Sequence, residues 1–322
     1  MAASQSLKSK ILNYSIKVNT FVQICKICEK CGGAMPSMEN PMSPFRILHI
    51  SDTHLSPRTE HFRRNNEEMI APLCASDHDY IVHTGDITLD GIRFEEDYVF
   101  CREFLGRTGK DILYIPGNHD IGDNPNLSKP EEEKGSRINA GRLARYKRYY
   151  DKDRWSFDRD GWRIVGINSM LIGSGLPEEQ EQFVWLDEQL DTLGDLHLAV
   201  FSHQPLFIDA PEVTELTYWT VDPSGTERLR RLVGHRSLRF IGSGHLHQQR
   251  SRAYGQIRLE WCSSIAFTTR EELVPEMGGT RLVGYLEHGF HPDGRVETTV
   301  RTLDSFTNNY LDDVLETVYP KY

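Results

Sequence analysis

Five short motifs along the chain carry side chains that bind metal ions or move protons. They read Asp-x-His, Gly-Asp, Gly-Asn-His-Asp, an isolated His, and Gly-His-x-His. The reactive positions are Asp52, His54, Asp86, Asn118, His119, His203, His245 and His247. Carboxylates and neutral imidazoles are ligands that suit Mn, Fe, Zn or Co. The motifs therefore predict a site for divalent metal ions.

The number of these ligands predicts two ions rather than one. All but His119 are candidate ligands, too many for a single tetrahedral ion. Two ions need a shared ligand, and Asp86, central in the set, can offer one carboxylate oxygen to each. Ions about 3.5–4 Å apart convert bound water into a bridging hydroxide and hold the attacking and leaving oxygens of a displacement. Such a pair is suited to hydrolysis of a phosphate ester.

Each motif alone has a simpler structural interpretation. Asp-x-His arises from a capping Asp beside a surface His, and Gly-Asp is common in turns. Gly-His-x-His is more specific, because alternate residues of an extended segment point to the same side. The five motifs in this order, each after an apolar run, favour a shared site.

The apolar runs before the motifs are typical of short buried strands. Segments with helical spacing of apolar residues, 66–75, 95–105 and 178–193, separate several of them. The expected strands are residues 45–50, 80–84, 112–115, 196–201 and 238–241. Alternating strands and helices predict an α/β fold whose carboxyl strand ends form the binding crevice.

The rest of the chain contributes a β-rich part and a charged insertion. Strands expected at 257–261, 280–286 and 296–301 would complete a second sheet within a single domain, residues 42–322, whose β-rich part begins near 255. Residues 129–150 are a charged insertion that ends in a basic helix. This helix either is simply solvated or lines the mouth of the site. Its basic residues are Arg142, Arg145, Lys147 and Arg148.

Residues 1–41 differ in composition from the remainder, and we expect a disordered extension. The apolar stretch 21–24 is shorter than the ~7–15 residues of a secretory signal core. Cys25, Cys28 and Cys31 lack a nearby fourth ligand, so a structural zinc site is not expected there. The cysteine usage favours a reducing compartment, and we expect a cytoplasmic protein.

Charge and hydropathy exclude other classes of function. With 37 basic and 47 acidic residues, the formal net charge is −10, which disfavours a nucleic-acid partner and hence a nuclease. No apolar run reaches the ~18 residues of a membrane span. Trp219, Phe267 and Tyr285 are either core residues, which we favour, or an interface of a homo-oligomer.

The ordered motifs resemble those of the calcineurin-like metallophosphoesterase superfamily, over residues 45 to about 266. The resemblance implies a four-layer α/β/β/α sandwich of two mixed β-sheets. It implies one metal held by Asp52, His54, Asp86 and His247, and a second held by Asp86, Asn118, His203 and His245. His119 would stabilise the transition state and protonate the leaving alkoxide. Asp120 would orient His119 or, alternatively, only cap the following turn.

Within this superfamily the chain is most similar to the class III cyclic-nucleotide phosphodiesterase and glycerophosphodiesterase branch. The similarity lies in segments 51–55, 117–120, 202–205 and 244–247. It implies hydrolysis of small phosphodiesters such as cyclic nucleotides or glycerophosphodiesters. A phosphomonoesterase or nucleotide pyrophosphohydrolase with the same metals is the alternative. An inactive scaffold is less expected, because all eight reactive positions are retained.

Overall fold

The computed structural model describes residues 43–124, 135–212, 218–221, 223–270 and 277–319. The expected N-terminal extension with Cys25, Cys28 and Cys31 lies outside these residues, as does the start of the charged insertion, 129–134.

Two mixed β-sheets form the centre of the fold. The five-stranded sheet has the order β11-β10-β1-β2-β3, in which β1, β2 and β3 are parallel and β10 and β11 are antiparallel to their neighbours. Its strands are β1 (Phe45–Ile50), β2 (Tyr80–His83), β3 (Ile112–Tyr114), β10 (Tyr285–Phe290) and β11 (Val296–Arg301).

The six-stranded sheet has the order β4-β5-β6-β7-β9-β8, with antiparallel strands at both edges. Its four inner strands are parallel. The strands are β4 (Trp155–Arg159), β5 (Trp162–Gly166), β6 (His197–Ser202), β7 (Leu238–Ser243), β8 (Arg250–Tyr254) and β9 (Ile257–Trp261).

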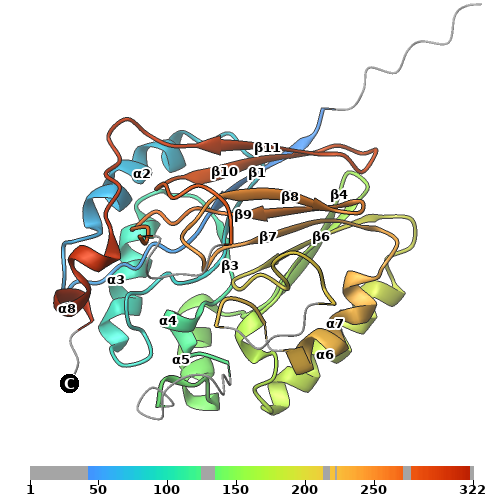
Figure 1. Cartoon of the computed structure of the whole chain (residues 1–322), viewed down its shortest axis with the longest axis horizontal. Coiled ribbons are helices and arrows are strands. Elements are labelled where there is room, and N and C mark those ends of the chain that lie inside the picture. Colours follow the sequence, from blue (N-terminus) through green and yellow to red (C-terminus); the bar gives the residue numbers. More distant parts are fainter. Residues whose placement is uncertain (1–42, 125–134, 213–217, 222, 271–276, 320–322) are drawn as a thin grey trace, which may run out of the picture. The chain divides into compact units, whose positions relative to one another are not determined.

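Three hydrophobic layers hold the sheets and helices together. Phe45 and Ile47 of β1 pack between the sheets with Phe201 and Phe240, whereas Leu48, one residue on, faces Met69 of α2 (Arg63–Ala75) on the outer side. This alternation is the two-residue period of a strand buried on both faces. Helices α6 (Pro177–Asp191) and α7 (Pro223–Val233) cover the outer face of the second sheet (Figure 1). The expected four-layer α/β/β/α sandwich is confirmed.

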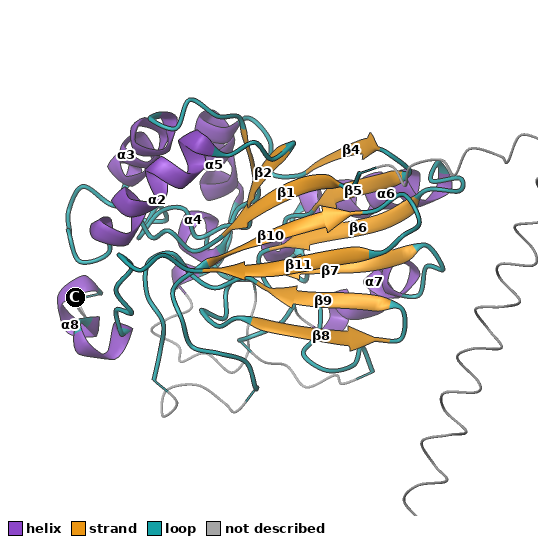
Figure 2. Ribbon diagram, turned by 90° about the horizontal axis from the view of Figure 1, so that it is seen from above, coloured by secondary structure: helices purple, strands orange, loops and turns teal. Residues whose placement is uncertain are grey.

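On the side of the first sheet, two further helices pack against each other. Tyr98 and Cys101 of α3 (Glu95–Gly106) share a buried cluster with Leu143 and Tyr146 of α5 (Ala140–Tyr150) (Figure 2). The expected basic helix at the end of the insertion is therefore α5. Its apolar face packs into the fold, so it is more than a solvated helix.

The prediction for the C-terminal strands was partly wrong. β9 joins the second sheet as expected, but β10 pairs with β1 and β11 pairs with β10, so both extend the first sheet. The strand expected at 280–286 begins only at Tyr285, because residues before it bond to loops: Thr280 pairs with Gln249, and Gly284 N–H donates to the Ser264 carbonyl. The hairpin β4–β5, strand β8 and helix α7 were not predicted.

The chain after β11 returns to the loops at the carboxyl ends of the strands. A 3₁₀ turn at Leu311–Asp313 precedes the short helix α8 (Leu315–Val318). Val318 is buried with Phe62, Leu89 and Phe267. Among the described residues, no helix has the length and apolar character needed to cross a bilayer.

Candidate metal centre

Seven predicted ligands converge beyond the carboxyl ends of β1, β2, β6 and β7 and at the start of the short helix α4 (Asn118–Ile121), which follows β3. Two overlapping groups have ligand atoms within 4.8 Å of one another. The first is Asp52, His54, Asp86 and His247, and the second is Asp86, His203 and His245. Asn118 Oδ1 lies 3.1 Å from His203 Nε2 and so joins the second group. All seven side chains are buried.

Asp86 lies at the junction of the two groups. Its Oδ2 is 3.7 Å from His54 Nε2 and 3.4 Å from His203 Nε2. Its other oxygen, Oδ1, accepts the backbone N–H of His119 at 2.8 Å. One oxygen is therefore held by the backbone while the other faces ligands of both groups.

Asp52 shows the same division between its two oxygens. Oδ2 accepts the backbone N–H of His245 at 3.0 Å. Oδ1 is buried without a hydrogen-bond partner, although His247 Nε2 is 3.3 Å away. A buried carboxylate oxygen without a donor is costly, and a cation is the usual remedy. These side chains fit a dinuclear divalent metal centre.

Hydrogen bonds on the far side of each imidazole show which nitrogen faces the centre. His203 Nδ1 donates to the Thr84 carbonyl at 2.7 Å, and His247 Nδ1 to the Phe267 carbonyl at 2.9 Å. His245 uses Nε2, which donates to the Tyr218 carbonyl at 3.0 Å. Because a carbonyl only accepts, the remaining nitrogen of each neutral ring carries a lone pair for a metal. His54 differs, since its Nδ1 lies 3.3 Å from the hydroxyl of Tyr319.

The backbone at the ligands is strained. Five of them have left-handed φ angles, a region that residues other than glycine seldom adopt. Only two other non-glycine residues in the described part of the chain do so, Asp151 and Asp160. The five are Asp52 (φ 55°), His54 (43°), Asp86 (52°), His245 (70°) and His247 (52°). Strain gathered in this way is typical of functional sites.

Two motif glycines allow the carboxylates to approach the backbone. A Cβ on Gly117 would lie 2.2 Å from Asp86 Oδ1, and one on Gly244 would lie 2.6 Å from Asp52 Oδ2. The glycines of Gly-Asn-His-Asp and Gly-His-x-His are thus required by close packing around the two aspartates.

Burial and mutual charge set the protonation of the centre. Burial opposes ionisation of Asp52 and Asp86, yet the neighbouring histidines outweigh it and hold both pKa values below the usual range. Burial also opposes charge on His203, but Asp86 raises the pKa of His203 to about 9. Burial and His203 lower the pKa of His245 to about 4. A raised pKa on His203 would let its proton offset part of the negative charge of the two carboxylates, a role that a bound cation would take over.

His119 lies beside the ligands with its own hydrogen bonds. Its Nδ1 lies 2.8 Å from the carbonyl of Leu89 and donates to it. Its ring contacts the ring of His54 edge-on, at 4.6 Å between centroids. The side chain is half-buried and lines a cavity, so Nε2 is the nitrogen available to a ligand.

The carboxylate of Asp120 bonds to the backbone beside His119 and to Thr88. The Asp120 carboxylate accepts the backbone N–H groups of Gly117 and Thr88, both at 2.9 Å, and the Thr88 hydroxyl at 2.8 Å. It therefore caps the turn that carries Asn118 and His119, which precedes it in the chain. Burial and the charge of Asp86 raise the pKa of Asp120 to about 6.

A cavity of about 610 Å³ opens beside the centre. Asn118 and His119 form its inner wall, and Arg142 of α5 lines it as well, so the insertion helix does reach the site. Tyr218 and Tyr319 also line it. Sequence reasoning missed both tyrosines, since no motif or spacing marks them.

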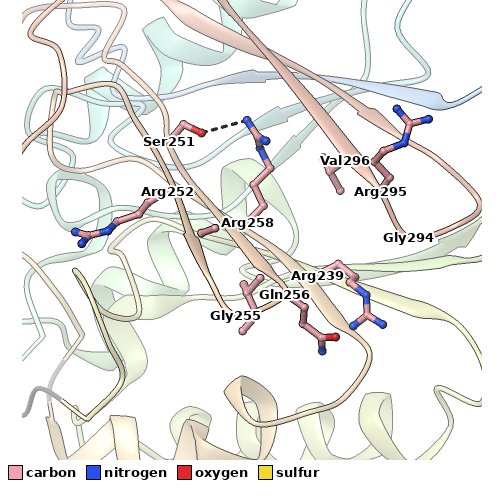
Figure 3. Close-up of a pocket in the computed structure, with 11 residues that line it drawn as sticks. Arg239, Ser251, Arg252, Gly255, Gln256, Arg258, Gly294, Arg295 and Val296 are labelled. Carbon is pink, nitrogen blue, oxygen red and sulfur yellow. Dashed lines mark hydrogen bonds between the residues drawn. The ribbon is translucent and has the colours of Figure 1, made fainter. Parts of the chain in front are cut away.

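A second hollow, of about 410 Å³, lies away from the metal ligands, between the β8–β9 hairpin and the β10–β11 turn. Four arginines line it, but their guanidinium groups point apart (Figure 3). Arg252, Arg258 and Arg295 also pair with the carboxylates of Asp209, Glu260 and Glu297. This hollow lacks the converging charge of an anion site.

Comparison with known families agrees with the geometry. The model of the calcineurin-like phosphoesterase family matches residues 45–249. The chain therefore belongs to this family of metallophosphoesterases.

Of three curated relatives, one is named a phosphatase and two are named phosphodiesterases. The human serine/threonine-protein phosphatase CPPED1 is 26% identical over 48% of this chain and 47% of its own length. A cAMP/cGMP dual specificity phosphodiesterase of Mycobacterium tuberculosis is 26% identical over 76% of this chain and 74% of its own. The 3',5'-cyclic adenosine monophosphate phosphodiesterase CpdA of Pseudomonas aeruginosa is 26% identical over 70% of this chain and 75% of its own length. The chain thus spans about half of the human phosphatase and about three quarters of the two phosphodiesterases.

Among solved structures, a dimetal phosphatase from Danio rerio has the same fold. It superposes with a TM-score of 0.52 and 15% identity, covering 80% of this chain and 96% of that one.

Proposed function

We propose that the chain is a metal-dependent phosphodiesterase that hydrolyses small phosphodiesters such as cyclic nucleotides or glycerophosphodiesters. The observation that carries this proposal is the pair of ligand groups sharing Asp86 beside a cavity lined by Asn118 and His119. Similarity to two cyclic-nucleotide phosphodiesterases supports the same choice of substrate.

The proposed ligand sets follow the two groups. Asp52, His54, Asp86 and His247 would hold one ion, and Asp86, Asn118, His203 and His245 the other. The donors suit Mn, Fe, Zn or Co. The two ions would supply Lewis acidity and a nucleophile drawn from water.

The chain's own residues would position the phosphate and protonate the leaving group. The Asn118 amide donates to the Tyr218 hydroxyl at 3.3 Å, which directs its oxygen toward His203. When the bond between phosphorus and the leaving oxygen breaks, the proton on His119 Nε2 would pass to that oxygen. The Leu89 carbonyl keeps the Nδ1 hydrogen in place, so Nε2 is the nitrogen that loses and regains the proton.

The charge of the cavity favours a diester over a monoester. Among the residues that the structure describes, the charged lining consists of Asp90, Asp123, Arg93 and Arg142, whose formal charges sum to zero. A diester carries one negative charge, whereas a monoester carries about two near neutral pH. A lining without excess positive charge suits the monoanion. The second organic group of a diester would find apolar surface at Leu311 and Leu315.

Two chromogenic esters test this proposal. The protein is treated with a chelator, given Mn²⁺ again, and assayed with bis-p-nitrophenyl phosphate and p-nitrophenyl phosphate side by side. Faster turnover of the diester is expected, and cyclic nucleotides and glycerophosphodiesters would be assayed next. Faster turnover of the monoester would replace the proposal by a phosphomonoesterase. Bound metal without turnover of either ester would favour a nucleotide pyrophosphohydrolase or a binding scaffold.

We further propose that residues 42–322 form one catalytic domain and that the protein acts in the cytoplasm. Phe267 and Tyr285 are buried, in line with a place in the core, so neither residue supports an interface of a homo-oligomer. Cell fractionation and sedimentation of the purified protein would test the location and the oligomeric state.

A further inference from the structure

The C-terminal segment, residues 309–319, places a side chain beside the candidate metal centre. We propose that Tyr319 is a positioning residue, which holds the ring of His54 with Nε2 directed at the first metal ion. This inference rests on the dinuclear centre of the proposed function, but not on the identity of its substrate.

The segment is fastened to the same loop that supports His247. Thr268 exchanges backbone hydrogen bonds with it, donating to the Asn309 carbonyl at 2.8 Å and accepting the N–H of Leu311 at 3.0 Å. The Thr268 hydroxyl donates to the His247 carbonyl at 2.9 Å. Val318, next to Tyr319, is buried at 7% exposure. The segment that carries Tyr319 is therefore held before α8, at Asn309 and Leu311, and within α8, at Val318.

Tyr319 contacts two histidines of the centre. Its hydroxyl is 3.3 Å from His54 Nδ1. Its ring packs on the ring of His119, with 5.3 Å between centroids. On the opposite edge of His54, Nε2 is 3.3 Å from His247 Nε2 and faces the carboxylates. The Tyr319 hydroxyl thus lies at Nδ1 of His54, and the proposed metal position lies at Nε2 of the same ring.

The chemistry of the hydroxyl distinguishes His54 from the other ligands. His203, His245 and His247 donate to backbone carbonyls, which no substitution of a side chain removes. His54 has a phenol in this place. When the phenol oxygen accepts the Nδ1 hydrogen, Nε2 keeps its lone pair for the ion, and the phenol hydrogen stays available to a ligand in the cavity that Tyr319 lines.

Tyr319→Phe removes the hydroxyl and keeps the ring on His119. Titration calorimetry with Mn²⁺, on chelated protein without substrate, should show one of two binding steps weakened about 10- to 100-fold, the usual effect of losing a partner behind a metal ligand. Tyr310→Phe is the matched control, because Tyr310 lies in the same segment and stacks on Arg270. It should bind Mn²⁺ as the wild type does. Wild-type affinity in Tyr319→Phe would overturn the inference.

A double-mutant cycle separates positioning from general damage to the fold. In a His54→Ala background the hydroxyl has no imidazole to hold, so adding Tyr319→Phe should leave the residual Mn²⁺ affinity unchanged. A further loss of affinity in that background would assign Tyr319 a merely structural role. Because no substrate is used, failure of phosphodiester hydrolysis would reject the proposed function and leave this result standing.

Discussion

The ring of His119 donates to the backbone carbonyl of Leu89, 2.8 Å away, so the nitrogen left for chemistry is Nε2. The same residue gives its backbone N–H to Asp86 Oδ1 at 2.8 Å. The proposed proton donor and the proposed shared metal ligand are thus fixed to each other through one residue. This relationship would tie the position of the proton to the position of the two ions.

His119→Ala should retain metal but lose turnover by about 10²- to 10⁴-fold, the typical contribution of a general acid. Metal content and kcat of the same preparation check this. The loss should be larger for a diester with an alkoxide leaving group than for bis-p-nitrophenyl phosphate, because p-nitrophenolate leaves without needing a proton. An equal loss for both substrates would argue against proton donation.

Asp86→Ala should lose both ions, whereas His203→Ala should lose one. Asp86 Oδ2 faces both groups, but His203 belongs only to the second. The metal-to-protein ratio after gel filtration measures the difference. Two retained ions in Asp86→Ala would contradict a shared ligand.

Gly117→Ala should abolish metal binding, because the added methyl would meet Asp86 Oδ1 at 2.2 Å. Gly106→Ala is the matched control. It is the last residue of α3, where an added Cβ meets nothing within 4 Å, and Ala should raise stability by about 0.5–1 kcal/mol. Metal content and thermal unfolding of the two variants, measured together, test the contrast.

The free energy of unfolding should fall below pH 6.5 in part because of two buried histidines. Burial lowers the pKa of His49 to about 3, and burial with His49 lowers that of His288 well below its usual value. Between pH 6.5 and 3 the two histidines bind protons in the unfolded chain but stay neutral in the folded chain. The contribution of each such histidine to the free energy of unfolding is therefore fully present above pH 6.5. As the pH falls below 6.5, the free energy of unfolding declines by ~1.4 kcal/mol per pH unit for each histidine.

Urea unfolding of chelated protein at pH 7.5 and 5.5 measures this decline. The double variant His49→Gln, His288→Gln replaces a pair linked at 3.2 Å between the sheets. It should show a smaller difference between the two pH values than the wild type. An identical difference would show that other groups account for the acid sensitivity.

The sequence predicted that the candidate ligands would lie together, because each follows an apolar run that becomes a strand. β1 ends at Ile50, two residues before Asp52, and β7 ends at Ser243, two before His245. Parallel strands bring their carboxyl ends to one edge, so residues far apart in the chain become neighbours. Alternate side chains of β1 point to opposite faces of the sheet, and because most of them are apolar, the strand is buried on both faces.

What the sequence did not predict depends on contacts between distant segments. The pairing of β10 with β1 is one of several pairings that similar apolar patterns allow. Which one forms depends on the packing of the complete fold. Tyr319 meets His54 across 265 positions, and although His54 belongs to the Asp-x-His motif, no motif marks the tyrosine. Asp120 follows His119 in sequence, yet its side chain turns to Gly117 and Thr88, because adjacent residues of a helical turn point in different directions.

The left-handed φ angles at five of the candidate metal ligands mean that the proposed site lowers the stability of the fold. Each such residue costs about 1–3 kcal/mol, and glycine would relieve it. His54, at φ 43°, is an example. A His54→Gly protein would relieve this angle, but it would also lose a candidate ligand and leave a cavity where a buried imidazole packs on the ring of His119. The site is thus built on backbone conformations that cost stability and that its side-chain packing holds in place.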